Sequence, residues 1–218
     1  MKRLLGYAAI LAFAILINGC AGIYKDINPP VIHYYNSDVS DGIGFSYKYD
    51  VLTERGNMRY AKKERKKGVK LVAVKITNNY DTTLNIGRDI IFYSGNDQIT
   101  IVNPYVVHNL IKQSTAGYLF YLLLTPLQFN TLDNYGRVIE TYNVGLAMGP
   151  GITLINMITA VNANSRLSRE LVKYNVMNRD IQSGETIYGI IGIMDTGFNP
   201  ISVRLRYPDD QAERNYYR

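Results

Sequence analysis

The sequence is poor in the residues that usually carry redox, metal or nucleophilic chemistry. Its 218 residues include one cysteine, Cys20, and two histidines, His33 and His108. A single cysteine excludes an internal disulfide and any metal site built from several thiolates. The histidines are far apart in the sequence, and neither has a neighbour that would complete a metal pair or a catalytic triad. We therefore expect no metal ion, no cofactor and no histidine-based catalysis.

Several motifs of enzymes and ligand-binding loops are also missing. No Gly-x-Ser-x-Gly element offers a nucleophilic serine, and Gly149-Pro150-Gly151 lacks the Gly-Lys-Ser/Thr that completes a phosphate-binding loop. The turn-forming segment 36–42 superficially resembles the start of a calcium loop. However, it has no glycine at its sixth position, and Tyr47 replaces the closing carboxylate. We predict a non-enzymatic protein without catalytic residues.

Three carboxylates, by contrast, lie near one another in the sequence, namely Glu170, Asp180 and Glu185. A pair of carboxyl groups can cleave a glycosidic bond when folding brings them to the two sides of that bond. A carboxylate-based carbohydrate-active or peptidoglycan-acting enzyme therefore stays open as an alternative.

The composition is that of a globular protein with one uneven charge distribution. Hydrophobic residues make up 47% of the chain and charged residues 19%, so extensive disorder is not expected. Six cations and one anion fall within residues 62–70, and the rest of the chain is nearly neutral. This basic run is either a solvated segment before the next strand or a contact for anionic lipid headgroups or lipopolysaccharide phosphates. No nucleic-acid-binding module accompanies it. The candidate contact residues are Lys62, Lys63, Arg65, Lys66 and Lys67.

Residues 1–19 have the composition of a secretory signal peptide. Lys2 and Arg3 precede an apolar core from Leu4 to Leu16, and the segment closes with small residues. A helix needs about 20 apolar residues to span a bilayer, so this core is too short for a good permanent anchor.

The end of this segment, Ile17-Asn18-Gly19-Cys20, resembles the lipobox of bacterial lipoproteins. The resemblance implies cleavage before Cys20, a thioether-linked diacylglycerol on its sulfur and a fatty acid such as palmitate on its new amino group. Two or more acyl chains anchor a protein stably, whereas one does not. An ordinary secretory signal followed by a chance cysteine is the alternative. Ala21 is not acidic, as the retention signal of some inner-membrane lipoproteins is, which favours lipid anchoring in the outer membrane.

The mature chain is expected to begin with a lipid anchor and tether over residues 20–41, where no apolar period is present. Between residues 42 and 206, short segments alternate apolar and polar residues and are separated by turns, as is typical of an antiparallel β-sandwich. The clearest of these predicted strands is 69–77. The tail, 207–218, is polar and aperiodic and is expected to be mobile.

Residues 103–180 interrupt the strand pattern and are expected to form an inserted helical segment. Two apolar runs, 117–129 and 144–161, are followed by a segment with helical spacing of apolar residues, 164–174. Proline and glycine interrupt both apolar runs, so neither would span a bilayer well. The insert is expected either to pack on the sheet or to meet a membrane or a partner protein.

A family resemblance extends this interpretation. The segment 68–79, GVKLVAVKITNN, resembles the second strand of immunoglobulin-like domains in bacterial envelope lipoproteins, and 181–189, IQSGETIYG, resembles their penultimate strand. With the apolar segment 118–126 and the glycines of 149–151, the chain is similar over about residues 55–206 to a group of uncharacterised bacterial envelope lipoproteins. The resemblance implies an immunoglobulin-like β-sandwich that carries an inserted apolar helical segment, and it implies no activity.

These observations predict a lipid-anchored cell-envelope protein of binding or structural type. The 19 tyrosines and the lack of tryptophan suit strand faces, and they also suit glycan or protein surfaces. The expected partners are therefore the membrane at Cys20 and another envelope protein or a glycan. A membrane-assembly factor that acts through the apolar insert, about 115–161, is a further alternative.

Overall fold

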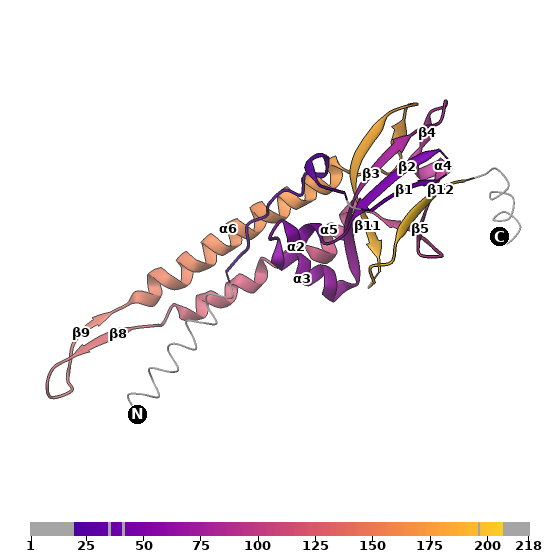
Figure 1. Ribbon diagram of the computed structural model, residues 1–218. Helices are drawn as coiled ribbons and strands as arrows, with labels where there is room; N and C mark the ends of the chain where they lie inside the picture. The colour runs from indigo at the N-terminus through magenta and orange to yellow at the C-terminus, as the bar shows by residue number, and fades with distance from the viewer. Residues whose placement is uncertain (1–19, 35, 41, 196, 207–218) are drawn as a thin grey trace, which may run out of the picture. The chain divides into compact units, whose positions relative to one another are not determined.

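The computed structural model describes residues 20–34, 36–40, 42–195 and 197–206 (Figure 1). The chain divides into two compact units. We call residues 20–23 and 113–164 the hairpin unit, and we call the described residues between 24 and 112 and between 165 and 206 the sheet unit. The expected signal peptide and mobile tail lie outside the described residues.

The sheet unit contains antiparallel strands and several short helices. Before the hairpin unit its elements are η1 (Pro29–Val31), β1 (Asn36–Ser40), β2 (Ile43–Lys48), α2 (Val51–Glu54), α3 (Met58–Lys67), β3 (Val69–Asn78), β4 (Leu84–Asn85), α4 (Ile86–Asp89), β5 (Ile90–Ser94), β6 (Asp97–Ile99), β7 (Ile101–Val102) and α5 (Pro104–Ile111). After it come β10 (Asp180–Ile181), β11 (Thr186–Met194) and β12 (Ile201–Leu205).

The strands of the sheet unit form two main antiparallel sheets. The larger has the order β1-β2-β3-β11-β7, and the smaller has the order β12-β5-β6. The longest ladder joins β3 to β11, from Val69 opposite Met194 to Thr77 opposite Thr186. The expectation of antiparallel strands is confirmed, and the helices make the fold a mixed one.

Alternate residues of these strands build one hydrophobic core. Ile43 and Phe45 of β2 and Val74 of β3 belong to the same buried cluster as Phe92 of β5 and Val203 of β12. The Phe45 and Phe92 rings meet edge to face, with centroids 6.1 Å apart. The two sheets therefore bury their inner faces against each other, and each fully buried side chain of this size contributes roughly 1.5–3 kcal/mol.

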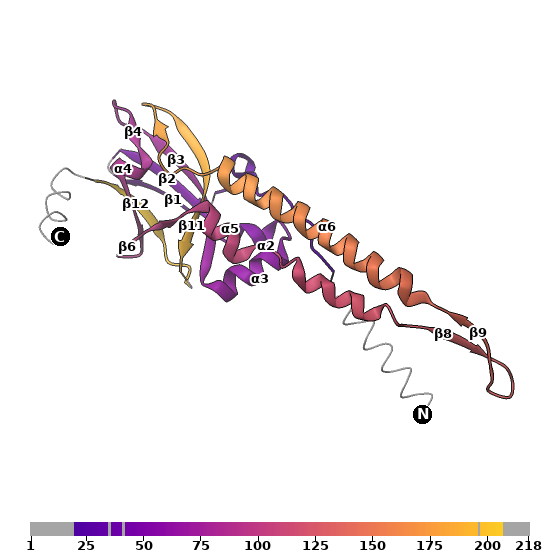
Figure 2. The same cartoon turned by 180° about the vertical axis from the view of Figure 1, so that it is seen from behind.

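Most of the basic run lies on the helix α3, which leads directly into β3. Gly68 ends the helix with a φ of 63°, and its N–H donates to the carbonyl of Arg65. Glycine adopts this left-handed conformation at little cost, which explains the sharp change from helix to strand. One face of α3 buries Tyr60, Ala61 and Glu64, and the helix lies beside α5 (Figure 2).

The hairpin unit contains the 3₁₀ helix η2 (Ala116–Leu124), the strands β8 (Phe129–Leu132) and β9 (Val138–Tyr142), and the start of α6 (Val144–Lys173), which ends in the sheet unit. The β8–β9 ribbon is a feature that the sequence pattern did not predict. Its turn is organised by Asp133, whose carboxylate accepts hydrogen bonds from the backbone N–H groups of Tyr135 and Arg137.

The helix α6 continues through the Gly149-Pro150-Gly151 segment, so the expected interruption there is wrong. Pro150 removes one backbone donor from the helix. Close packing within the hairpin unit favours the continuous helix, because a side chain at Gly145 would lie 2.2 Å from the carbonyl oxygen of Leu124. A side chain at Gly149 would lie 2.6 Å from the Thr125 hydroxyl. The two glycines therefore let α6 approach the end of η2.

Candidate functional site

The most unusual feature of the described residues is the amount of apolar surface on the hairpin unit. Phe120 and Leu123 on η2 are 75% and 74% exposed, and Ile155 on α6 is 68% exposed. Monomeric soluble proteins rarely leave large contiguous apolar patches in water. The large apolar residues of this unit that are at least 40% exposed are Ile23, Leu119, Phe120, Leu122, Leu123, Leu127, Phe129, Leu132, Tyr135, Val138, Ile139, Tyr142, Leu146, Met148, Leu154, Ile155, Ile158 and Val161.

The same unit is almost free of charge. Between residues 113 and 164 the charged residues are Asp133, Arg137 and Glu140, all of which lie on the β8–β9 ribbon or in its turn. Asp133 and Arg137 also neutralise each other in an ion pair of 2.8 Å. The helical parts of the unit therefore present neither sign of charge to their surroundings.

Among the described residues, α6 is the one helix that is long and apolar enough to cross a membrane. Length and composition alone do not separate such a helix from the core helix of a soluble protein, which is mostly buried. In α6, only 28% of the most apolar window of 18 residues is buried, and the mean hydropathy of that window is 1.6. The exposed surface of that window is thus largely apolar.

Within the hairpin unit, polar side chains hold the residues that follow Cys20. The N–H of Ala21 donates to Asn156 Oδ1 of α6 at 2.5 Å, and Gly22 exchanges two hydrogen bonds with the Gln113 side chain, at 2.9 and 2.6 Å. Asn156 and Gln113 are buried, whereas Cys20 is exposed. The predicted lipid attachment residue is therefore held beside the apolar hairpin with its side chain accessible.

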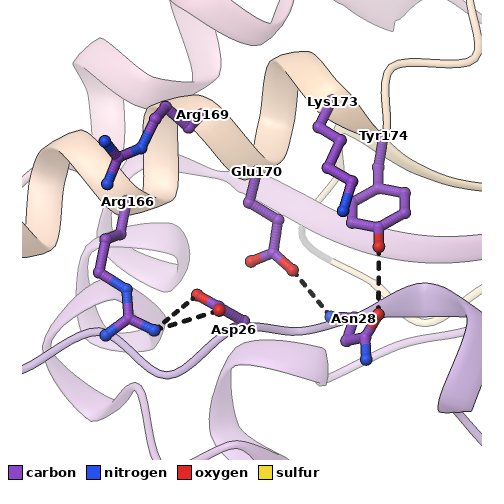
Figure 3. Close-up of a pocket in the computed structure, with 7 residues that line it drawn as sticks. All are labelled: Asp26, Asn28, Arg166, Arg169, Glu170, Lys173 and Tyr174. Atoms are coloured by element: carbon purple, nitrogen blue, oxygen red, sulfur yellow. Dashed lines mark hydrogen bonds and ion pairs between the residues drawn. The ribbon is translucent and has the colours of Figure 1, made fainter.

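In the sheet unit, the buried carboxylate of Glu170 holds residues 24–28, which we call the pinned segment. It accepts hydrogen bonds from the Tyr24 hydroxyl at 2.5 Å and from the N–H groups of Ile27 and Asn28 at 3.0 and 2.8 Å. Figure 3 shows the bond from Asn28. Burial and then the Glu170 carboxylate raise the pKa of the Tyr24 phenol well above its usual range. Tyr24 and Ile27 are completely buried. The described part of the segment expected to be a free tether thus includes a packed stretch.

The residues around Glu170 enclose a cavity of about 360 Å³. One side of it carries the ion pair of Arg166 with Asp26, at 3.1 Å, and Tyr174 donates to Asn28 Oδ1 at 3.1 Å (Figure 3). The Arg169 guanidinium points away from Asp26 and Asn28 (Figure 3). The acidic groups of this cavity already have partners, so it offers no free carboxylate for catalysis.

The three carboxylates that are close in sequence each have separate structural partners. Glu170 accepts hydrogen bonds from the pinned segment. Asp180 accepts from the Asn85 side chain at 2.7 Å, and Glu185 accepts from the N–H of Gln182 at 2.8 Å. Their hydrogen bonds therefore give no indication of a shared catalytic site.

A second cavity of about 250 Å³ brings together carboxyl groups that the sequence did not single out. Asp50, Glu64 and Asp195 line it, together with Lys70 and Phe198. Glu64 is 6% exposed and accepts a hydrogen bond of 2.6 Å from the N–H of Leu71. Burial raises the pKa of this carboxyl group to about 7. Because these acids are distant in sequence and have no shared motif, no local signal could have identified them.

The two histidines do not form part of a metal site in the described part of the chain. His33 follows η1 and lines a small cavity with Lys48 and Glu54, and His108 lies on α5. No group of three or more potential metal-ligating residues occurs among the residues that the structure describes.

The five candidate cations of the basic run all lie on α3. Lys62, Arg65, Lys66 and Lys67 are exposed and Lys63 is half-buried. None of the five forms an ion pair with a carboxylate of the described residues.

Comparison with known proteins gives no relative for this chain. No protein-family model matches the chain, and neither a curated protein nor a solved structure matches it.

Proposed function

We propose that this chain is a lipid-anchored cell-envelope protein of non-enzymatic, binding or structural type, whose hairpin unit enters the bilayer that holds the acyl chains of Cys20. The observation that carries the proposal is the exposed, nearly uncharged apolar surface of the hairpin unit. The sequence supplies the anchor signal, and the hydrogen bonds of Ala21 and Gly22 keep the anchor residue beside that surface. The outer membrane is the favoured location, as Ala21 is not acidic.

The dimensions of the hairpin agree with insertion beside the lipid. The helix α6 begins at Val144, twelve residues before Asn156, which corresponds to about 18 Å of helix at 1.5 Å per residue. The hydrocarbon core of a bilayer is about 30 Å thick, so this length reaches past its middle. Helices satisfy most of their own backbone hydrogen bonds, as the apolar phase requires. Transfer of half of a leucine-sized side chain out of water contributes about 1 kcal/mol.

Vesicle flotation of the unlipidated chain tests insertion directly. The protein is residues 20–218 with Cys20→Ser, and the vesicles are neutral phosphatidylcholine. The triple variant Phe120→Gln, Leu123→Gln and Ile155→Gln is expected to bind about a hundredfold more weakly, at about 1 kcal/mol for each side chain.

The matched control replaces three exposed apolar residues on helices of the sheet unit, Met58→Gln, Val106→Gln and Val172→Gln, and is expected to bind like the parent. These positions are 54%, 50% and 46% exposed, so neither triple variant removes core packing. A parent protein that stays with the soluble fraction would contradict the proposal.

We propose an immunoglobulin-like arrangement for the sheet unit. In such sandwiches one sheet has strands A, B, E and D, and the other has C, F and G, with C′ beside C in some domains. The order β2-β3-β11-β7 corresponds to A-B-E-D, and the order β12-β5-β6 corresponds to F-C-C′. The hairpin unit is then an insertion between strands D and E. In this assignment β11 takes the place of strand E beside strand B, and not the penultimate position that the resemblance implied. The described residues contain no counterpart of strand G.

The sheet unit is the part that we propose meets another envelope protein or a glycan. Cross-linking of intact membranes followed by purification of the chain would identify such a partner. Recovery of the same proteins by a chain in which the exposed side chains of the sheet unit are substituted would contradict this assignment.

A second candidate function is favoured by the cavity around Glu64. A carboxyl group with a pKa raised to about 7 lines this cavity with Asp50 and Asp195, and a glycoside-cleaving enzyme uses a carboxyl group of raised pKa together with a second carboxyl group. Incubation with purified peptidoglycan should then release soluble fragments, and Glu64→Gln should abolish the release. Absence of any turnover by the folded wild-type chain would eliminate this candidate.

A further inference from the structure

The end of α5 brings a further cation to the basic helix α3. The Lys63 ammonium group donates a hydrogen bond to the backbone carbonyl of Lys112, which caps the C-terminus of α5. The pKa of Lys63 is lowered by burial and then by the neighbouring charges of Lys67, Lys112 and Lys66. Two helices that are separated in the sequence thus place four ammonium groups within electrostatic reach of one another.

No acidic side chain of the described residues neutralises this cluster. Glu64, the only acid in the run, is turned into the protein and bonded to the N–H of Leu71. Lys112 donates to the Asn109 side chain, which carries no charge. A positive charge near a helix C-terminus is favourable, but one cation satisfies that requirement. The remaining charges repel one another and would be stabilised by an anion with several negative groups.

The covalent chain passes directly from this cluster to the unit that holds the predicted lipid anchor. Lys112 is the last residue of the sheet unit before Gln113, and the Gln113 side chain is hydrogen-bonded to Gly22, two residues after Cys20. The cluster therefore precedes, along the chain, the segment that we propose enters the bilayer.

We infer that Lys63, Lys66, Lys67 and Lys112 form a binding surface for the phosphate groups of anionic membrane lipids. Lysine binds phosphate as a compact point charge, and anionic membrane surfaces attract such clusters when they are held within a Debye length. The inference rests on the proposed function for the presence of the bilayer, but the interaction is separate from that of the apolar hairpin. It adds Lys112 to the basic run and favours a lipid contact over a merely solvated segment.

The experiment measures partition of the Cys20→Ser chain, residues 20–218, between water and two kinds of vesicle. One kind is phosphatidylcholine alone, and the other contains phosphatidylglycerol in addition. The triple variant Lys66→Gln, Lys67→Gln and Lys112→Gln leaves Lys63 in place to cap α5. It is expected to lose about fivefold in affinity for the anionic vesicles per lysine, on the order of a hundredfold in total, and nothing for the neutral vesicles.

A matched control removes the same number of charges elsewhere in the sheet unit, through Lys75→Gln, Arg179→Gln and Arg204→Gln. An equal loss in this control would overturn the inference, because net charge alone would then explain the binding. Full competition by inorganic phosphate at the concentration of the lipid phosphate would overturn it as well. Failure of the parent chain to bind neutral vesicles, with a retained preference for anionic ones, would contradict the proposed insertion and leave this inference standing.

Discussion

Glu170 is the residue whose substitution tests the packing of residues 24–28 most directly. In Glu170→Gln the amide oxygen can still accept from Tyr24 and Ile27, but the amide NH₂ would face the N–H of Asn28. The hydrogen bond from the Asn28 N–H to a charged oxygen is lost. The amide NH₂ of the substituted residue is left as a buried donor without an acceptor. Hydrogen bonds to charged groups contribute about 1.5–3 kcal/mol, and an unsatisfied buried donor costs about 1–3 kcal/mol. We therefore expect a loss of about 3 kcal/mol in the free energy of unfolding.

Urea unfolding followed by circular dichroism, on the Cys20→Ser chain, measures this loss. Tyr24→Phe removes one of the three hydrogen bonds and should cost about 1 kcal/mol. Glu185→Gln, at an exposed carboxylate with a single hydrogen bond, should change stability by less than about 0.5 kcal/mol. Release of the pinned segment should also make the chain more susceptible to trypsin at Lys25 in the Glu170→Gln variant, because the side chain is already exposed and only the ordered backbone protects the bond. If Glu170→Gln is no more destabilising than Glu185→Gln, the segment is not held as described.

Three further predictions concern the anchor, a buried acid and the hairpin. Cys20→Ser should abolish labelling of the chain by a clickable fatty acid, and continued labelling would disprove lipidation at Cys20. The folded state holds its proton on Glu64 up to a pKa of about 7, above the value of 4.5 for a free carboxyl group. The folded state therefore binds more protons than the unfolded state between these pH values, and stability falls as pH rises from about 4.5 to 7, by on the order of 3 kcal/mol. Glu64→Gln should flatten this dependence in urea midpoints measured across the range, and an unchanged slope would assign it to another group. Gly145→Ala should lower the thermal stability of the hairpin unit by about 1–3 kcal/mol through its clash with the Leu124 carbonyl. Gly151→Ala, where a side chain meets open space, should raise it by up to about 1 kcal/mol.

The strands of the sheet unit could be predicted because their period is local. Alternation from Ile43 to Tyr47 and from Val72 to Ile76 reports which side of each strand is buried, and these residues do belong to the core. The pairing of β3 with β11 is not local, because the Thr77 and Thr186 hydroxyls that bond across it are 109 residues apart. Periodicity identifies a strand without identifying its neighbour.

The packed stretch after the anchor could not be predicted for a similar reason. Residues 24–28 have no period of their own, and their order depends on Glu170, which lies more than 140 residues further along the chain. The continuity of α6 escaped prediction because Gly149-Pro150-Gly151 has the composition of a turn. The tertiary contact of Gly145 and Gly149 with the end of η2 outweighs that local preference.

The acids of the second cavity could not be predicted from the sequence either. Asp50 precedes α2, Glu64 lies on α3 and Asp195 follows β11, and no spacing rule relates them. The basic run, in contrast, was visible in the sequence because its charges are consecutive. The contribution of Lys112 to it required the contact between α3 and α5.

The position of the hairpin unit between β7 and β11 has a consequence for how the chain folds. The larger sheet cannot complete its pairing until β11 is available, because β11 joins β3 on one side and β7 on the other. Closing so long a loop makes this a late and slow step. The hairpin unit is therefore synthesised before β11, and it can enter its final environment while the larger sheet is still incompletely paired. Once β11 is paired with β7, hydrogen bonds join the strand before the insertion to the strand after it. A protease that cuts the β8–β9 turn should thus leave two fragments that remain associated.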